Sequence, residues 1–255
     1  MHLSFIEVGP DNVVDHGLCC VANRKSPGFK SKLEWFRDVT NIGTGMVIAL
    51  DQSTEKQVGF VEYTDSELAW RPVKAENQLF IHCITVFSKS SRNQETGSRL
   101  IREVERIALG KNKQGVCVMT SDGVWMAGKS LFEKNGYSKT DQSGRFELMW
   151  KPLVKTCKKP ELINWEQKLP AYSGWHLLYS DQCPWHIKSA SDISDYATSV
   201  GININVAKLS SPIEAQNGPS GYGTFALIKD GKLLADHYIS RTRFINILKK
   251  ELEKA

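Results

Sequence analysis

One stretch constrains the fold of this chain more than any other: residues 79–110, LFIHCITVFSKSSRNQETGSRLIREVERIALG. It begins as a β-branched and aromatic run and passes through a polar turn. Apolar residues then recur at helical spacing, with Leu100, Val104 and Ile107 on one face. This order predicts a strand that leads through a turn into an amphipathic helix.

The start of that helix is a candidate phosphate site. The first N–H groups of a helix have no partner within the helix, and the helix dipole makes this end positive, so anions bind there readily. An ordinary strand–helix connection has the same pattern, and short motifs often match by chance. From the pattern alone, the ordinary connection is the simpler interpretation.

Composition indicates a globular protein. The 255 residues, 41% hydrophobic and 24% charged, suffice for one large domain or two modest ones with a buried core. No apolar run is long enough for a membrane span, and the first residues lack a secretion signal, so we expect a cytoplasmic protein without membrane contact. The net charge of +5 is spread thinly, which gives nucleic-acid binding little support.

The cysteines have neither metal-ligand spacing nor a CxxC pair. In a chain of this length they indicate reduced cytosolic thiols rather than a disulfide framework, and we expect no metal. The six are Cys19, Cys20, Cys83, Cys117, Cys157 and Cys183.

Two motifs resemble the GNAT N-acetyltransferase superfamily. Residues 92–97, Arg-Asn-Gln-Glu-Thr-Gly, resemble its Arg/Gln-x-x-Gly-x-Gly pyrophosphate loop. Residues 131–137, Leu-Phe-Glu-Lys-Asn-Gly-Tyr, resemble its Leu-Tyr-Glu-Lys-x-Gly-Phe signature, and they follow the strand predicted over 115–121 at the expected distance. The resemblance implies an acetyl-CoA-dependent enzyme.

Three further segments resemble a narrower group of GNAT proteins, those with a YoaP-like C-terminal domain. They are AWRPV at 69–73, IHCI at 81–84 and VMTS at 118–121. The similarity covers almost the whole chain. It implies an α/β (α+β) GNAT acyltransferase fold with a mixed central sheet in residues 1–152, a linker over 153–170 and a smaller domain over 171–255.

The pattern in the first domain is that of paired helices and a hairpin. We predict helices over 11–22 and 30–41, and strands over 46–50, 57–63 and 146–151. In the second domain we predict strands over 176–179, 202–209, 225–228 and 233–238, with helices over 184–200, 212–216 and near the C-terminus. The order in the second domain resembles the thioredoxin-like fold.

The resemblance implies where acetyl-CoA binds. In GNAT proteins the central strand splays from its neighbour, and the freed backbone groups bind the pantetheine arm; the pyrophosphate lies over the loop and helix start. By position, the cofactor-binding residues here are Ile84, Thr85, Val86, Arg92, Asn93, Gln94, Glu95, Thr96, Gly97 and Ser98.

Two residues depart from the family pattern. Glu95 stands where the loop normally has its first glycine, so we expect its carboxylate to point away from the phosphates that it would repel. Phe132 stands where many GNAT enzymes have a tyrosine that protonates the leaving thiolate, and phenylalanine has no proton to give.

Acetyl transfer also needs a base for the amine, and His82 is the titratable side chain beside the predicted splay. Two carboxylates lie nearby in the sequence, Glu62 on the preceding strand and Glu67 in the loop after it, and we take Glu62 as a further candidate catalytic residue. Ser121 or Thr120, at the end of the next strand, is a candidate to replace the tyrosine through a water; protonation of the thiolate by solvent is the alternative. From the pattern alone, a half-buried, hydrogen-bonded structural histidine is the simpler interpretation of His82.

Trp70 and Arg71 lie in a polar loop between two strands. We interpret them as one wall of the acceptor site, with Arg71 able to bind an acidic group in bidentate fashion. A tryptophan packed over the core beside a solvated arginine is the alternative.

Cys183-Pro184-Trp185-His186 occupies the predicted helix start where glutaredoxin-like proteins have Cys-Pro-Tyr-Cys. A thiol at a helix N-terminus beside a histidine can react as a thiolate. The second cysteine is absent, and Gly223 stands where redox-active members have a cis-proline. We therefore favour a structural or recognition role for Cys183 over monothiol chemistry.

The sequence predicts an N-acetyltransferase that moves an acetyl group from acetyl-CoA to an amine of a small molecule or peptide. Two alternatives remain: a non-catalytic acyl-CoA-binding protein, indicated by Glu95 and Phe132, and a monothiol redox protein centred on Cys183. The acceptor amine and the oligomeric state stay open.

Overall fold

The computed structural model describes residues 2–18, 20–21, 23–92 and 95–253, and the chain divides into two units. The first unit comprises Met1–Ala22, Phe36–Ala69 and Val73–Ile163; the second comprises Asn23–Trp35, Trp70–Pro72 and Asn164–Ala255. Two segments from the N-terminal half are therefore grouped with the C-terminal part of the chain. The predicted boundaries after residues 152 and 170 stay a prediction.

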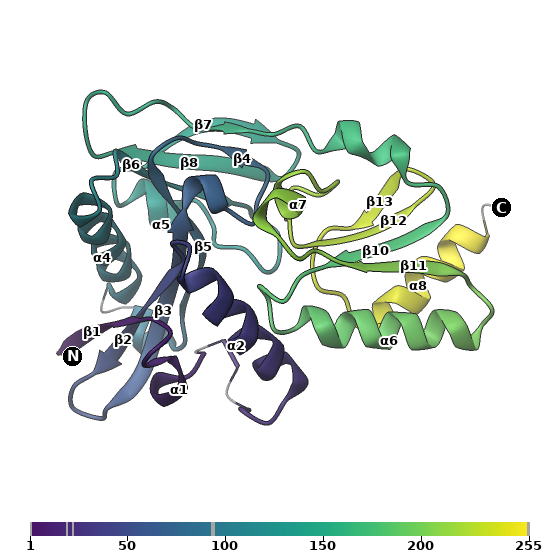
Figure 1. The fold of residues 1–255 in the computed structure, drawn as a ribbon, viewed down its shortest axis with the longest axis horizontal. Helices are drawn as coiled ribbons and strands as arrows, with labels where there is room; N and C mark the ends of the chain where they lie inside the picture. The colour runs from purple at the N-terminus through teal and green to yellow at the C-terminus, as the bar shows by residue number, and fades with distance from the viewer. Residues whose placement is uncertain (1, 19, 22, 93–94, 254–255) are drawn as a thin grey trace. The chain divides into compact units, whose positions relative to one another are not determined.

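A seven-stranded mixed sheet forms the first unit (Figure 1), in the order β1-β2-β3-β5-β6-β8-β7. Only β5 and β6 run parallel; the other neighbours are antiparallel. The strands are β1 (Leu3–Val8), β2 (Gly45–Asp51), β3 (Lys56–Asp65), β5 (Gln78–Val86), β6 (Gly115–Thr120), β7 (Ser138–Ser143) and β8 (Phe146–Pro152). The predicted α+β class with a mixed central sheet is confirmed.

The helix predicted after the polar turn is α4 (Thr96–Gly110), and its apolar stripe covers the sheet. Leu100, Ile101 and Val104 are fully buried in one core with residues of β2, β3 and β5. Four more helical segments lie in the described part of the first unit: α1 (Val13–His16), α3 (Lys89–Arg92), α5 (Ser130–Glu133) and the 3-10 turn η1 (Ser66–Leu68). Helix α2 (Pro27–Thr40) crosses the division between Trp35 and Phe36.

The predicted helix over residues 11–22 is wrong in its extent. Helix α1 ends at His16, because Gly17 follows with φ +74° and cannot continue a right-handed helix. The predicted linker is also partly ordered: β9 (Glu161–Leu162) pairs with β4 (Val73–Lys74), and a 3-10 helix, η2, spans Glu166–Ala171.

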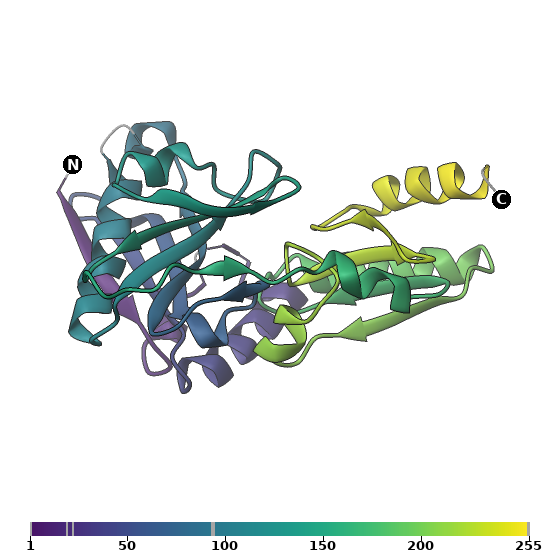
Figure 2. The same ribbon diagram turned by 90° about the horizontal axis from the view of Figure 1, so that it is seen from above.

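A four-stranded sheet forms the second unit, in the order β11-β10-β12-β13. Strands β10 and β11 are parallel, and the other pairs are antiparallel. The elements are β10 (Trp175–Tyr179), α6 (His186–Ser199), β11 (Ile204–Lys208), α7 (Pro212–Gln216), β12 (Phe225–Lys229), β13 (Lys232–Ala235) and α8 (Arg241–Leu252). Figure 2 shows α8, in yellow, after the β12–β13 hairpin.

This unit follows the predicted order of elements, with boundaries shifted by a few residues. Helix α6 packs against β10, β11 and α8. Ile193 of α6 and Phe244 of α8 are fully buried, as the helical spacing of apolar residues requires. In the described part of the chain, no helix is long and apolar enough to cross a membrane.

Candidate functional site

The central sheet opens between β5 and β6. Their parallel register places residues 78–81 opposite residues 115–118, yet β5 continues to Val86 and β6 to Thr120. On its other side β5 stays paired with β3 as far as Val86, opposite Gly59. In the described part of the chain, the pairing of β5 with β6 thus ends before residues 84–86, the segment where the resemblance implies the splay.

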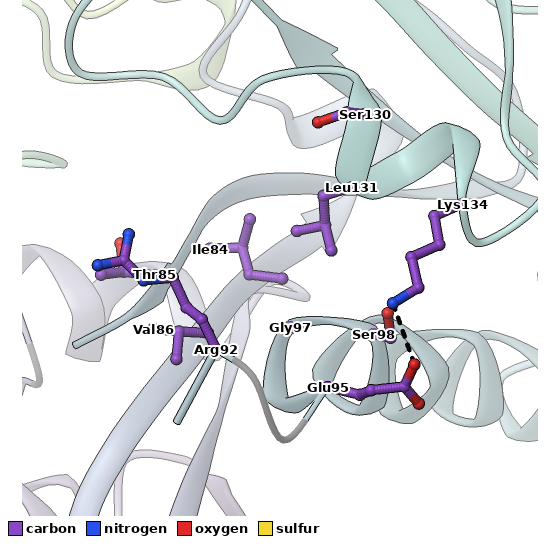
Figure 3. Close-up of a pocket in the computed structure, with 10 residues that line it drawn as sticks. All are labelled: Ile84, Thr85, Val86, Arg92, Glu95, Gly97, Ser98, Ser130, Leu131 and Lys134. Carbon is purple, nitrogen blue, oxygen red and sulfur yellow. Dashed lines mark hydrogen bonds and ion pairs between the residues drawn. The ribbon is translucent and has the colours of Figure 1, made fainter. Parts of the chain in front are cut away.

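A cavity of about 570 Å³ lies at this opening (Figure 3). Its lining residues come from four places: the end of β5, the end of α3, the start of α4, and α5 together with Lys134, which follows α5. The lining residues are Ile84, Thr85, Val86, Arg92, Glu95, Gly97, Ser98, Ser130, Leu131 and Lys134. The structure thus gathers most of the predicted cofactor-binding residues around one cavity.

Among the described members of the predicted set, Thr96 is not a lining residue. The Thr96 hydroxyl donates a hydrogen bond to the Ser91 carbonyl (2.7 Å), so this side chain closes the preceding turn. Asn93 and Gln94 lie outside the described residues.

Gly97 makes room at the start of α4. A Cβ at this position would lie 3.2 Å from a methyl carbon of Leu131, closer than an ordinary contact. A side chain here would fill the space between α4 and Leu131 on the cavity wall. The motif glycine therefore keeps the backbone of the helix start accessible from the cavity.

Glu95 lines this cavity, and the expectation that its carboxylate points away from bound phosphates stays a prediction. The residue is the N-cap of α4 with φ +58°, in the left-handed region that favours glycine. Its carboxylate does not cap the helix but accepts a hydrogen bond from Lys134 Nζ at 3.0 Å (Figure 3). That hydrogen bond and the Lys134 charge lower the pKa of Glu95.

Lys134 is a lining residue that sequence reasoning did not identify. It lies in the segment 131–137 that resembles the family signature, and it follows α5 directly. The motif was its only signal, and a motif does not reveal where the side chain points. Figure 3 shows Lys134 and Arg92 at opposite ends of the drawn site, so two cations flank the start of α4.

His82 and Glu62, both predicted as catalytic, lie together. His82 Nδ1 is 3.4 Å from Glu62 Oε1, and 0% and 1% of the two side chains are exposed. The register between β3 and β5 skips His82, so this residue is a β-bulge on β5. A bulge redirects a side chain, and here it brings the imidazole to the carboxylate two residues before Ile84, where the cavity lining begins.

Ser121 lies elsewhere. Its hydroxyl accepts hydrogen bonds from Arg145 Nη1 (2.8 Å) and from the Gly123 N–H (3.1 Å), and it is buried. These contacts anchor the loop after β6. Ser121 is not among the described residues that line the cavity, and its catalytic role stays a prediction.

Phe132 is part of the core. It is fully buried on α5 and makes an edge contact with Tyr137, with ring centroids 5.5 Å apart. The position that carries a proton donor in many GNAT enzymes here contributes packing only.

Trp70 and Arg71 are grouped with the second unit, and the solvated-arginine alternative is wrong. Arg71 is 3% exposed. Its Nη1 donates to the Trp70 carbonyl (2.9 Å) and to Thr224 Oγ1 (3.2 Å), and its guanidinium lies 4.5 Å from the Tyr222 ring centroid. Trp70 meets Trp35 edge-on at 5.5 Å. The described contacts of both residues are therefore structural ones within the second unit, and the acceptor-wall role stays a prediction.

Cys183 is partly exposed and precedes α6, which begins at His186 rather than at the predicted Pro184. His186 is fully buried, with Nδ1 3.2 Å from the Ser180 carbonyl oxygen. Burial, and next the charge of Arg71, lower the pKa of His186 to about 3. The imidazole is therefore neutral near pH 7 and supplies no charge to stabilise a Cys183 thiolate.

Gly223 has a specific reason to be glycine. Its φ is +75°, and a Cβ here would lie within 2.4 Å of the Trp70 carbonyl oxygen. The backbone of Trp70 and Arg71 thus occupies the space beside Gly223.

Among the described residues no peptide bond is cis. In the same part of the chain, no group of three or more His, Cys, Asp or Glu side chains is placed to hold a metal ion.

Comparison with known proteins finds one relative along the whole chain. No family model matches. The chain is 26% identical over 259 residues to the Bacillus subtilis (strain 168) protein named "Uncharacterized N-acetyltransferase YoaP". The alignment covers 96% of this chain and 98% of that protein. The predicted resemblance to the GNAT N-acetyltransferases, and with it the acyltransferase class, is confirmed; the thioredoxin-like character of the second domain stays a prediction.

Solved structures match part of the chain at low identity. The PaiA N-acetyltransferase of Thermoplasma acidophilum, solved in complex with coenzyme A, is 15% identical with a TM-score of 0.43. NAA60 of Arabidopsis thaliana, solved in complex with acetyl-CoA, is 16% identical with a TM-score of 0.42. Each match covers 60% of this chain and 99% of the other chain.

Proposed function

We propose that this protein, similar over its whole length to an N-acetyltransferase, transfers the acetyl group of acetyl-CoA to an amine. The observation that carries the proposal is the cavity where β5 and β6 part, with the start of α4 on its wall. Its lining contains the residues that the loop motif marks for CoA. The acceptor is an amine of a small molecule or a peptide.

The residues present fit the co-substrate. The backbone N–H groups at Gly97 and Ser98 begin a helix of 15 residues and suit a diphosphate, since the helix dipole favours negative charge there. Arg92 and Lys134 add positive charge. The backbone of residues 84–86, where the described pairing of β5 with β6 has ended, suits the amide-containing arm of CoA in the way that one strand pairs with another. When bound, the thioester supplies the activated acetyl group.

His82 is the proposed general base, with Glu62 as its positioning partner. His82 takes the proton of the attacking nitrogen while the N–C bond forms and the C–S bond breaks, and Glu62 stabilises the imidazolium that results. Because Phe132 has no proton to give, the leaving sulfur takes its proton from solvent, or from a water held by Ser121.

A calorimetric titration with acetyl-CoA tests the proposal. We expect wild-type binding near the micromolar range, and loss of binding in Gly97→Val, whose side chain fills the cavity wall. Gly110→Ala is the matched control, because nothing lies within 4 Å of a Cβ there. Failure of the wild type to bind acetyl-CoA would overturn the proposal.

An amine panel with detection of released CoA thiol then separates the catalytic from the non-catalytic alternative. Thiol release that needs an added amine supports the transferase. Tight binding of acetyl-CoA without thiol release on any amine supports a non-catalytic acyl-CoA-binding protein. The monothiol alternative loses its main support, because His186 is neutral and supplies no charge to Cys183.

We further propose that the protein is cytoplasmic. We also propose that residues 1–152 form the GNAT domain and residues 171–255 a thioredoxin-like domain. The order of elements supports the thioredoxin-like assignment. Along the chain, α6 connects the parallel strands β10 and β11, and the β12–β13 hairpin and α8 follow. Independent folding of a fragment that starts at residue 171 would test these boundaries.

A further inference from the structure

We propose that Glu95 is a built-in competitor of the CoA diphosphate: its carboxylate holds Lys134 at the cavity, and phosphate binding requires Lys134 to exchange that carboxylate for a phosphate oxygen. This inference rests on the proposed function and adds to it. It assigns Lys134 as a diphosphate-binding residue and Glu95 as the residue that sets CoA affinity.

The backbone position of Glu95 is the first argument. A glutamate with φ +58° pays a steric cost that glycine avoids, and it begins the very helix whose first N–H groups suit an anion. A short polar side chain at an N-cap normally accepts a hydrogen bond from its own helix, but this carboxylate makes none. It reaches Lys134 instead, at 3.0 Å.

The charges around the cavity are the second argument. Among the described lining residues Arg92 and Lys134 are cations, and Glu95 is the one carboxylate. A diphosphate at the start of α4 brings negative charge beside Glu95, and like charges at such distances repel. Both side chains of the Glu95–Lys134 pair are more than half exposed, so the pair is weak and can be displaced.

Lys134 carries one positive charge, which cannot neutralise both the Glu95 carboxylate and a diphosphate. An ammonium group binds carboxylate and phosphate by the same charge-assisted hydrogen bonds, and a diphosphate carries more charge than a carboxylate. Its stem begins directly after α5 and its tip lies at the start of α4 (Figure 3), so a change of rotamer suffices for the exchange.

Calorimetric titration of CoA into variants of the full chain tests the exchange. We expect Glu95→Gln to bind CoA about three- to tenfold more tightly than the wild type, because one repulsive charge at a partly screened site is removed. Glu95→Gly should bind at least as tightly as Glu95→Gln. Glu133→Gln is the matched control: it removes the same charge from an exposed neighbour of Lys134 that does not line the cavity.

Lys134→Met separates the two roles of the lysine. In the wild-type background, Lys134→Met removes a phosphate contact and also leaves the Glu95 charge without its cation. The loss of CoA affinity that Lys134→Met causes should therefore be larger in the wild-type background than in the Glu95→Gln background. A smaller but measurable loss in that second background supports a direct phosphate contact. No loss there would show that Lys134 serves Glu95 only, and would overturn its assignment.

Three ligands identify the phosphate. The effect of Glu95→Gln should persist with dephospho-CoA, which keeps the diphosphate, and should vanish with pantetheine, which has none. An effect that disappears with dephospho-CoA would assign the pair to the 3′-phosphate and overturn the diphosphate proposal. If the wild type binds CoA and Glu95→Gln binds it equally well, this inference alone fails. If the wild type binds none of the three ligands, the proposed function fails as well.

Discussion

His82 Nδ1 lies 3.4 Å from Glu62 Oε1 in the interior of the first unit, and the β-bulge on β5 is what turns the imidazole toward the carboxylate. Both side chains are buried, and a buried carboxylate is costly unless a charged or hydrogen-bonding partner accompanies it. The two groups therefore act as one unit, in stability as well as in the proposed chemistry.

Substitution of this pair is the first prediction. His82→Gln and Glu62→Gln should each lower kcat/KM for acetyl transfer by about 10²- to 10³-fold, because general-base assistance contributes on this scale. The affinity for acetyl-CoA should change little, since neither residue lines the cavity among those described. Steady-state kinetics over pH 5–9 with calorimetry of acetyl-CoA binding check both points. Full activity in His82→Gln would reduce this pair to a structural role.

A second prediction concerns stability and pH. His186 has a folded-state pKa of about 3 against an ordinary value of 6.5, because burial disfavours its charged form. The unfolded chain therefore binds more protons between these values. Above about pH 6.5 this group does not lower the free energy of unfolding. As the pH falls from there toward 3, it lowers the free energy of unfolding by up to about 1.4 kcal/mol per pH unit.

Urea unfolding at pH 7.5 and pH 5 measures this loss. His186→Gln keeps a side-chain N–H for the Ser180 carbonyl but does not titrate, so its unfolding free energy should fall less between the two pH values than that of the wild type. An identical fall in both proteins would contradict the buried neutral state of His186.

The third prediction treats Arg71 as a stabilising residue of the second unit. Arg71→Gln should lower the unfolding free energy by about 1–3 kcal/mol, since it removes the hydrogen bond to Thr224 and the cation over the Tyr222 ring. Arg37→Gln, at an exposed position, should change it by less than about 0.5 kcal/mol. If Arg71→Gln instead raised KM for the amine at unchanged stability, Arg71 would belong to the acceptor site.

A fourth prediction compares two glycines of similar backbone conformation. Gly201 has φ +72° with nothing within 4 Å of a Cβ, so Gly201→Ala should cost only the left-handed strain, about 1 kcal/mol. Gly223 has φ +75°, and its Cβ would strike the Trp70 carbonyl. Gly223→Ala should therefore cost about 1–3 kcal/mol more. Equal melting temperatures for the two variants would mean that the Trp70 segment does not pack there in solution.

Strands differed in how well the sequence predicted them. The buried strands β2, β3, β5 and β6 were predicted because they are rich in β-branched, aromatic and other apolar residues. Strand β7, Ser138–Ser143, was missed, since it lies at the sheet edge and its residues are polar. An edge strand buries little, so hydrophobic patterning carries no signal for it.

By itself the sequence determined the features that a continuous piece of backbone carries: the strand, turn and helix over residues 79–110, and the motif residues that line one cavity. Consecutive residues share a helix start whatever the rest of the chain does. Only the tertiary structure decided the pairings between distant positions: Glu95 with Lys134, His82 with Glu62, and Arg71 with Thr224. Those depend on strand register, a bulge and the packing of separate segments, which no local pattern records.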